Sequence, residues 1–399
     1  MYAKKMFIKV FFISFLVSNV NCDVNLKLKQ VLMLSRHNVR TPLSKTLCDY
    51  TPKPWPHWTE KRGYLTAKGA LLEGYMGEFI ASWLRKEALL PENCPKDEDL
   101  YVYANTAQRT MASAKAFVNK AFPLCNITIH HSSQGTDPIY NPFIHNTTKI
   151  FQTEAAEQMR LLLKSLNINK SYEDIGKILE YSMSEKCLKE HKCDLINDKN
   201  RILLASGTKP NVDGPLKISN SVIDSFIMEN YEGFPLQNVA WGQLTNKESW
   251  NSILDLSRGF HNVIFNITLI AKDIAKPLLH FMTEILKNNH HKVSLLMGHD
   301  ANIYTVLKSM GFKTYNLENQ YEKIPAGGKI VYQKWLEVNT GVLYMKIDYI
   351  YQSTDGMRQG NRLSIENPPQ ITNLELEGCK INENGMCLWS DFVKLLNNL

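Results

Sequence analysis

Three short apolar runs are the clearest signals of buried strands in this chain. They lie at residues 29–34, 100–104 and 293–297. Each run ends abruptly in polar or charged residues, as a strand buried on both faces does. Two further segments, 329–338 and 342–351, alternate between apolar and polar residues on either side of an Asn-Thr-Gly turn and predict a hairpin.

Helical periodicity separates these predicted strands. Apolar residues recur at helical spacing after Thr66, which is a suitable N-cap, and further helices are predicted after the second strand and at 274–288. Residues 136–262 are mostly polar, with helical patches and few strand signals. We therefore expect an α/β fold with a mostly parallel sheet flanked by helices, formed by residues 23–135 and 263–399, and an inserted helical cap at 136–262.

Residues 1–22 have the features of a secretory signal peptide. Three lysines precede an apolar run at 11–17, which is too short for a transmembrane helix, and no later run reaches the roughly 20 apolar residues that such a helix requires. We expect cleavage after Cys22, and a lipid anchor on Cys22 is the alternative. The mature chain is therefore expected to be exported and soluble, with no membrane partner.

Composition and charge exclude some classes of partner. The chain has 399 residues, of which 44% are hydrophobic and 21% charged, as in an ordinary globular protein. The formal net charge is +7, and it becomes +4 without the signal peptide, which holds three lysines and no acidic residue. So small an excess, spread over the whole chain, is not typical of a nucleic-acid-binding surface, and we expect no nucleic-acid partner.

The chain contains eight cysteines, which in an exported protein indicate disulfides. Spacing suggests three local pairs: Cys94 with Cys125, Cys187 with Cys193, and Cys379 with Cys387. Zinc binding is the competing interpretation, although the sequence has no CxxC motif. Cys48 is then unpaired, or it pairs with Cys22 if that residue is retained. The sequence alone does not choose the connectivity.

The ends of the three apolar runs carry the candidate chemistry. The first is followed by Arg36, His37 and Arg40, the second by Arg109, and the third by His299 and Asp300. In open α/β sheets, ligands bind beyond the carboxyl ends of the strands, so these side chains are expected to converge. Arginine presents forked donors that suit phosphate oxygens. The set therefore predicts a site for a phosphate group.

Such a site needs neither a metal nor a cofactor. A neutral His37 can attack phosphorus and form a phosphohistidine, while the arginines stabilise the charge on the phosphoryl oxygens. Asp300 can protonate the leaving group if burial or the bound phosphate raises its pKa, which predicts an acidic optimum. Each of these residues alone is better explained as an ordinary surface or strand-end residue. Their combination at three strand ends favours the site.

At these residues the sequence resembles the histidine acid phosphatases, whose signature is Arg-His-Gly-x-Arg-x-Pro followed much later by His-Asp. Asn38 stands where most of that family has glycine. In this it resembles the family's bacterial periplasmic glucose-1-phosphatases, which carry Arg-His-Asn at this point. The resemblance implies that His37 is phosphorylated, that Arg36, Arg40, Arg109 and His299 bind phosphate, and that Asp300 donates a proton. It also implies a phosphoglycerate-mutase-like core with a helical cap and no cofactor, and the three local cysteine pairs fit it.

The resemblance specifies the substrate less well than the chemistry. Glucose 1-phosphate is the leading substrate, phytate or a broad range of phosphomonoesters is the alternative, and a catalytically silent phosphosugar-binding protein is the non-enzymatic one. A phosphohistidine mutase is disfavoured by the signal peptide. The resemblance to bacterial enzymes implies a periplasmic location. Secretion is the alternative, since N-x-S/T sequons at Asn126, Asn146, Asn169 and Asn266 would permit glycosylation in a eukaryotic secretory pathway.

Overall fold

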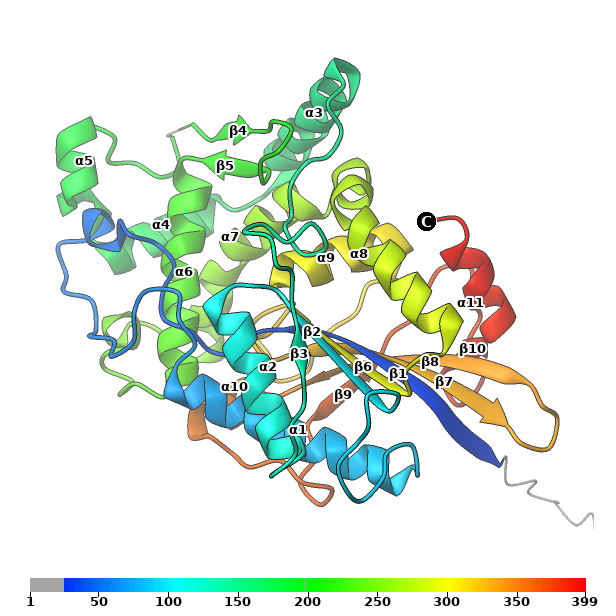
Figure 1. Cartoon of the computed structure of the whole chain (residues 1–399). Helices are drawn as coiled ribbons and strands as arrows, with labels where there is room; N and C mark the ends of the chain where they lie inside the picture. The colour runs from blue at the N-terminus through cyan, green and yellow to red at the C-terminus, as the bar shows by residue number, and fades with distance from the viewer. Residues whose placement is uncertain (1–24, 198) are drawn as a thin grey trace, which may run out of the picture.

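An eight-stranded mixed sheet forms the centre of the fold. The structure, a computed structural model, describes residues 25–197 and 199–399, so the predicted signal peptide lies outside the described residues. The strand order is β10-β8-β7-β1-β6-β2-β3, and β9 pairs with β8 (Figure 1). The strands are β1 (Leu26–Arg36), β2 (Leu100–Ala104), β3 (Ile129–His130), β6 (Val293–Gly298), β7 (Lys329–Glu337), β8 (Leu343–Tyr351), β9 (Gln370–Asn373) and β10 (Met386–Leu388).

The predicted strands and their directions account for most of this sheet. The strands β1, β6, β2 and β3 are parallel, whereas β7, β8, β9 and β10 add antiparallel pairings. The α/β fold is therefore confirmed, and so is the hairpin, whose strands are β7 and β8. β1 begins at Leu26, earlier than predicted, because its first residues pair with β7 while Lys27 and Lys29 remain exposed.

Helices cover both faces of the sheet. Successive residues of β1 point to opposite faces, so they pack in two different apolar clusters. Val31 and Met33 pack in the apolar cluster that contains α1 and α2, and Leu32 and Leu34 pack in the cluster that contains α8 and α9. Thr66 caps α1, since its hydroxyl accepts a hydrogen bond from the backbone of the first turn. These helices are α1 (Ala67–Lys86), α2 (Gln108–Ala121), α8 (Thr268–Asn288) and α9 (Asp300–Met310).

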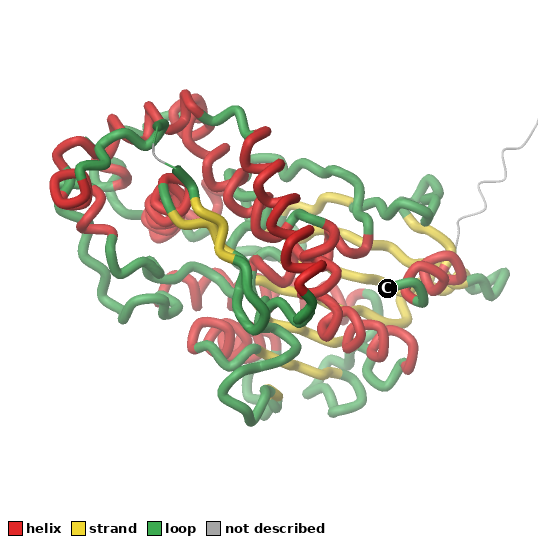
Figure 2. Tube along the Cα trace, turned by 90° about the horizontal axis from the view of Figure 1, so that it is seen from above, coloured by secondary structure: helices red, strands yellow, loops and turns green. Residues whose placement is uncertain are grey.

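A group of helices lies beyond one end of the sheet (Figures 1 and 2). It consists of α3 (Lys149–Ser165), α4 (Asn169–Leu179), α5 (Glu185–Glu190), α6 (Pro215–Glu232) and α7 (Lys247–Phe265), with the short hairpin β4 (Arg201–Leu203) and β5 (Asn211–Asp213). Buried side chains of α6 and α7 share one apolar cluster with those of α8 and α9. The elements fall almost entirely within residues 136–262, and the assignment of that segment as a cap domain stays a prediction.

Three disulfides join the cysteines in the pairs that spacing suggested. They are Cys94–Cys125, Cys187–Cys193 and Cys379–Cys387. Cys48 is exposed and is the free cysteine of the described residues, while Cys22 lies outside them. Among the helices that the structure describes, we find none long and apolar enough to cross a membrane.

Candidate active site

Strand register brings the predicted residues to one edge of the sheet. Arg36 is the last residue of β1 and lies opposite Gly298 of β6, and β2 ends beside Met297. The N–H of His37 donates to the carbonyl of Gly298 at 3.0 Å. The three parallel strands therefore end together, which places the segments after them side by side.

These segments line a cavity of about 690 Å³. His37, Arg40, Arg109, His299 and Asp300 all face it, whereas Arg36 lies behind it against Asp300. Helix starts fix three of these positions: Arg109 is in the first turn of α2, His299 is the N-cap of α9, and Asp300 is its first residue. The structure thus brings together all six residues that the sequence singled out.

The imidazole of His37 is held in one tautomer. Its Nδ1 lies 2.8 Å from the carbonyl oxygen of Asn38, and because a carbonyl can only accept, Nδ1 carries the proton. The lone pair is then on Nε2. Burial lowers the pKa of His37 well below its ordinary value, and the charges of Arg109 and other nearby cations lower it further. The ring is therefore neutral, as a nitrogen nucleophile must be.

His299 is held by two neighbours and packs edge-to-face against His37, with 5.4 Å between ring centroids. Its Nε2 donates to the side-chain oxygen of Asn105 at 2.9 Å, and its Nδ1 accepts from Arg109 at 3.4 Å. Burial and the charge of Arg109 lower the pKa of His299 well below its ordinary value. Two neutral histidines therefore lie among the cations.

The three arginines differ in their partners. Arg40 makes a two-point ion pair with Asp224 of α6, at 2.9 and 2.8 Å. Arg36 donates to Glu322 at 2.7 Å and to the backbone carbonyl of Ile324. Arg109 forms no ion pair within the described part of the chain, and burial lowers its pKa to about 10, assisted by the charge of Arg40. It is the cation best placed to take an anion from solution.

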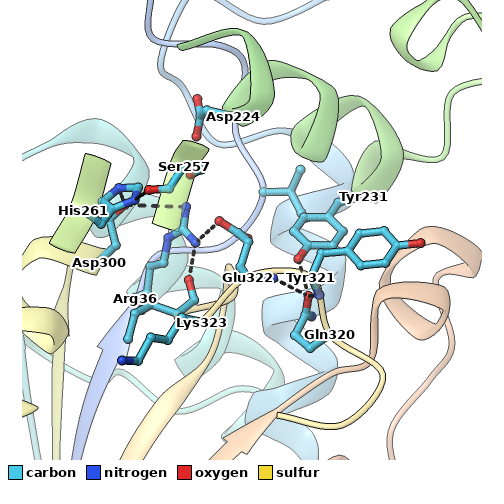
Figure 3. A network of polar contacts seen from close by, with 12 residues as sticks. Arg36, Asp224, Tyr231, Ser257, His261, Asp300, Gln320, Tyr321, Glu322 and Lys323 are labelled. Carbon is cyan, nitrogen blue, oxygen red and sulfur yellow. Dashed lines mark hydrogen bonds and ion pairs between the residues drawn. The ribbon is translucent and has the colours of Figure 1, made fainter. Parts of the chain in front are cut away.

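Asp300 lies between the guanidinium of Arg36 and the imidazole of His261, whose own pKa burial lowers below its ordinary value. Its Oδ2 is 3.8 Å from the guanidinium of Arg36 and 3.9 Å from Nε2 of His261. Figure 3 shows these three residues side by side. Burial raises the pKa of Asp300, but Arg36, His261 and Lys209 outweigh burial and hold it well below its ordinary value. Of the two causes that the sequence left open, burial does raise this pKa but is outweighed, so a bound anion remains as the cause of a raised pKa.

Besides Tyr50 and Glu322, sequence reasoning missed four charged or titratable residues that residues 136–262 contribute to the cavity. They are Lys209, Lys217, Asp224 and His261. All four come from the segment predicted as a cap, where no strand end marks a ligand-binding position. His261 is held by the donation of its Nδ1 to the carbonyl of Ser257 at 2.9 Å, and its ring stacks on Tyr304. The spacing of residues in the sequence contained no signal for these contacts.

Comparison with known proteins agrees with this geometry. The family model of the histidine phosphatase superfamily (branch 2) matches residues 27–351. The chain belongs to this superfamily. Membership confirms the predicted histidine phosphatase, and with it a phosphomonoester hydrolase.

Relatives of this histidine phosphatase cover nearly its whole length. It is 39% identical over 390 residues to a glucose-1-phosphatase of Providencia rettgeri, covering 95% of this chain and 94% of that one. It is 38% identical to a glucose-1-phosphatase of Salmonella typhimurium, with 93% and 92% covered. Among solved structures, the apo phytase of Hafnia alvei matches with a TM-score of 0.86 at 28% identity, covering 94% of this chain and 97% of that one.

Proposed function

We propose that this histidine phosphatase is an exported enzyme that hydrolyses glucose 1-phosphate to glucose and phosphate. The observation that carries the proposal is a neutral His37 with a free Nε2 in a cavity lined by cations. The choice of substrate rests on relatives: two glucose-1-phosphatases are 38–39% identical to the chain, whereas a phytase of Escherichia coli is 26% identical.

In the first step, Nε2 of His37 attacks phosphorus and the bond between phosphorus and the ester oxygen breaks. Arg40, Arg109 and His299, which face the cavity, bind the transferred phosphoryl group, and Arg36 adds positive charge from behind them; together they stabilise the charge on its oxygens. Arg109 contributes a cation without a carboxylate partner among the described residues. Arg40 and Arg36 are positioned by Asp224 and Glu322, so their guanidinium groups need little reorganisation when phosphate binds.

Asp300 supplies the proton that the leaving oxygen requires. In the free protein Asp300 is ionised, since the nearby cations lower its pKa. A phosphate dianion beside it adds like charge and raises that pKa, so binding is coupled to proton uptake. In the second step, water attacks the phosphohistidine, Asp300 accepts its proton, and neutral His37 is regenerated. This coupling is our reason for expecting an acidic optimum.

Phytate is the second candidate substrate, and two lysines favour it. Lys209 and Lys217 line the cavity in addition to the arginines, and burial lowers the pKa of both. A substrate with several phosphate groups would use these cations, whereas glucose 1-phosphate has one phosphate group. Both lysines come from residues 136–262, and we propose that this segment acts as the cap that shapes the substrate pocket.

The experiment compares phosphate release by the purified protein and by His37→Ala, from acid to neutral pH, on glucose 1-phosphate and on phytate. The proposal expects activity in the unchanged protein alone, with a higher kcat/KM for glucose 1-phosphate. A preference for phytate would keep the chemistry and change the substrate. Release of phosphate from no monoester at any pH would favour the silent phosphosugar-binding protein.

The same proposal places the enzyme in the periplasm, with secretion into the medium as the alternative. Three disulfides fit an oxidising compartment outside the cytoplasm. Fractionation of the native host distinguishes the two locations: release by osmotic shock indicates the periplasm, and recovery from the culture medium indicates secretion.

A further inference from the structure

Three buried polar side chains from distant parts of the sequence meet behind the loop that carries His37. Asn38 follows His37, Glu73 lies on α1, and Lys329 begins β7. Glu73 and Lys329 are 0% exposed, and Asn38 is 1% exposed. Nζ of Lys329 donates to Oε1 of Glu73 at 2.8 Å, and Nδ2 of Asn38 donates to Oε2 of Glu73 at 2.9 Å. Both carboxylate oxygens are thus engaged.

This network continues to the imidazole of His37 through one peptide unit. Oδ1 of Asn38 accepts from the N–H of Val39 at 2.8 Å. The carbonyl of the same peptide unit, that of Asn38, accepts from Nδ1 of His37 at 2.8 Å. The N–H of Asn38 donates to the hydroxyl of Ser113 at 3.1 Å, which fixes the loop on its other side. The orientation of one peptide therefore decides which imidazole nitrogen holds the proton.

We propose that Asn38, Glu73 and Lys329 are positioning residues that fix the tautomer and direction of the His37 imidazole. The inference rests on the proposed function, in which His37 is the nucleophile. Lys329 also donates to the carbonyl of Gly327 at 2.8 Å, so the segment before β7 is tied to the same network. None of the three side chains is among the residues that line the cavity, so they act through His37.

Packing alone does not explain this arrangement. A buried ion pair is commonly no more stabilising than well-packed apolar residues of the same volume, because both charges lose their hydration. The surrounding backbone is also shaped to admit Asn38: Gly327 has a φ of +71°, and a Cβ there would collide with Nδ2 of Asn38. Glycine at this position leaves room for the Asn38 amide that donates to Glu73.

The network can be tested by exchanging the amide of Asn38 and the carboxylate of Glu73. In Asn38→Asp, two carboxylates face each other, and in Glu73→Gln, an amide N–H faces another donor on Asn38 or Lys329. Both single variants should lose about 100-fold in kcat on glucose 1-phosphate, since a misplaced nucleophile costs that much, while KM changes little. The double variant Asn38→Asp/Glu73→Gln restores every donor–acceptor pair and the net charge. It should recover most of the lost kcat.

A spectroscopic readout separates positioning from stability. In ¹⁵N-histidine-labelled protein, the His37 signals should show a protonated Nδ1 and an unprotonated Nε2, and the single variants should shift toward a mixture of tautomers. Gln333→Met is the matched control, because Gln333 lies on the same strand and its buried side chain donates to Asp348 at 2.7 Å, away from the site. It should lower Tm without changing kcat or the His37 signals.

Two results would overturn the inference: single variants that keep the Nδ1-protonated tautomer and full kcat, or a double variant no better than the single ones. Failure of the proposed function looks different, because the tautomer is measured without substrate. If His37→Ala retains turnover while the tautomer shifts as expected, the proposed nucleophile is wrong and the positioning network still stands.

Discussion

Replacement of Asp300 by asparagine tests the proton-transfer step most sharply. The change keeps the size of the side chain and its acceptor for the N–H of Ala301, which lies 2.7 Å from Oδ1. It removes the proton donor and the negative charge that lies 3.8 Å from Arg36. General acid catalysis contributes about 10²- to 10⁴-fold, so kcat on glucose 1-phosphate should fall by that range.

Two further effects of Asp300→Asn can be predicted, one on the rate with a better leaving group and one on KM. p-Nitrophenyl phosphate releases an anion that needs little protonation, so its kcat/KM, which reports the phosphorylation step and not the hydrolysis step shared by all substrates, should fall by less than about tenfold. Two unit charges about 4 Å apart interact by about 4 kcal/mol at an effective dielectric constant of about 20, and solvent at the partly exposed Asp300 weakens this. Loss of that charge leaves Arg36 freer to attract phosphate, so KM should not rise.

The assay measures kcat and KM for both substrates in the unchanged protein and in Asp300→Asn across acid to neutral pH. In the unchanged protein, kcat on glucose 1-phosphate should decline as pH rises, because Asp300 must be protonated in the complex. The variant should lack this decline. Equal losses of kcat/KM on the two substrates, or a pH profile that keeps the same decline, would refute the proton-donor role.

The remaining predictions concern the nucleophile, the link between α6 and the His37 loop, and metals. His37→Ala should abolish turnover with little change in Tm, as calorimetry would check, because the ring faces the polar cavity and its loss opens no space within the apolar clusters. Asp224→Ala should lower the free energy of unfolding by about 3–5 kcal/mol in urea titrations, since it leaves Arg40 buried and unpaired. Burial raises the pKa of Asp224, but the charge of Arg40 outweighs burial and lowers this pKa in the folded protein. The stabilisation is therefore present above the unfolded pKa of about 3.9, and it is lost as pH falls through the lower folded value. Dialysis against a chelator should leave kcat unchanged, and strong inhibition would contradict a metal-free mechanism.

The sheet was predictable because its signals are local. A strand buried on both faces needs a continuous apolar run, and β1, β2 and β6 each have one. The carboxyl ends of parallel strands meet at one edge, so the segments after them, with His37, Arg109 and His299, could be expected to converge before any distance was known.

The contacts from α6 and α7 were not predictable in this way. Asp224 and His261 lie on helices whose placement depends on how one large apolar cluster packs, and helical periodicity gives the buried face but not its neighbour. The direction in which the pKa of Asp300 is shifted in the free protein was not predictable for the same reason. Its sign depends on Arg36, His261 and Lys209, which three separate segments bring beside it.

The most direct test of the account is to trap the phosphorylated protein. Glucose 1-phosphate labelled with ³²P in its phosphate group is mixed with the enzyme and quenched in base within milliseconds, and the labelled peptide is identified by mass spectrometry. The account predicts an acid-labile phosphohistidine at His37, absent from His37→Ala. Label on another residue, or release of glucose with no labelled protein at any time, would contradict it.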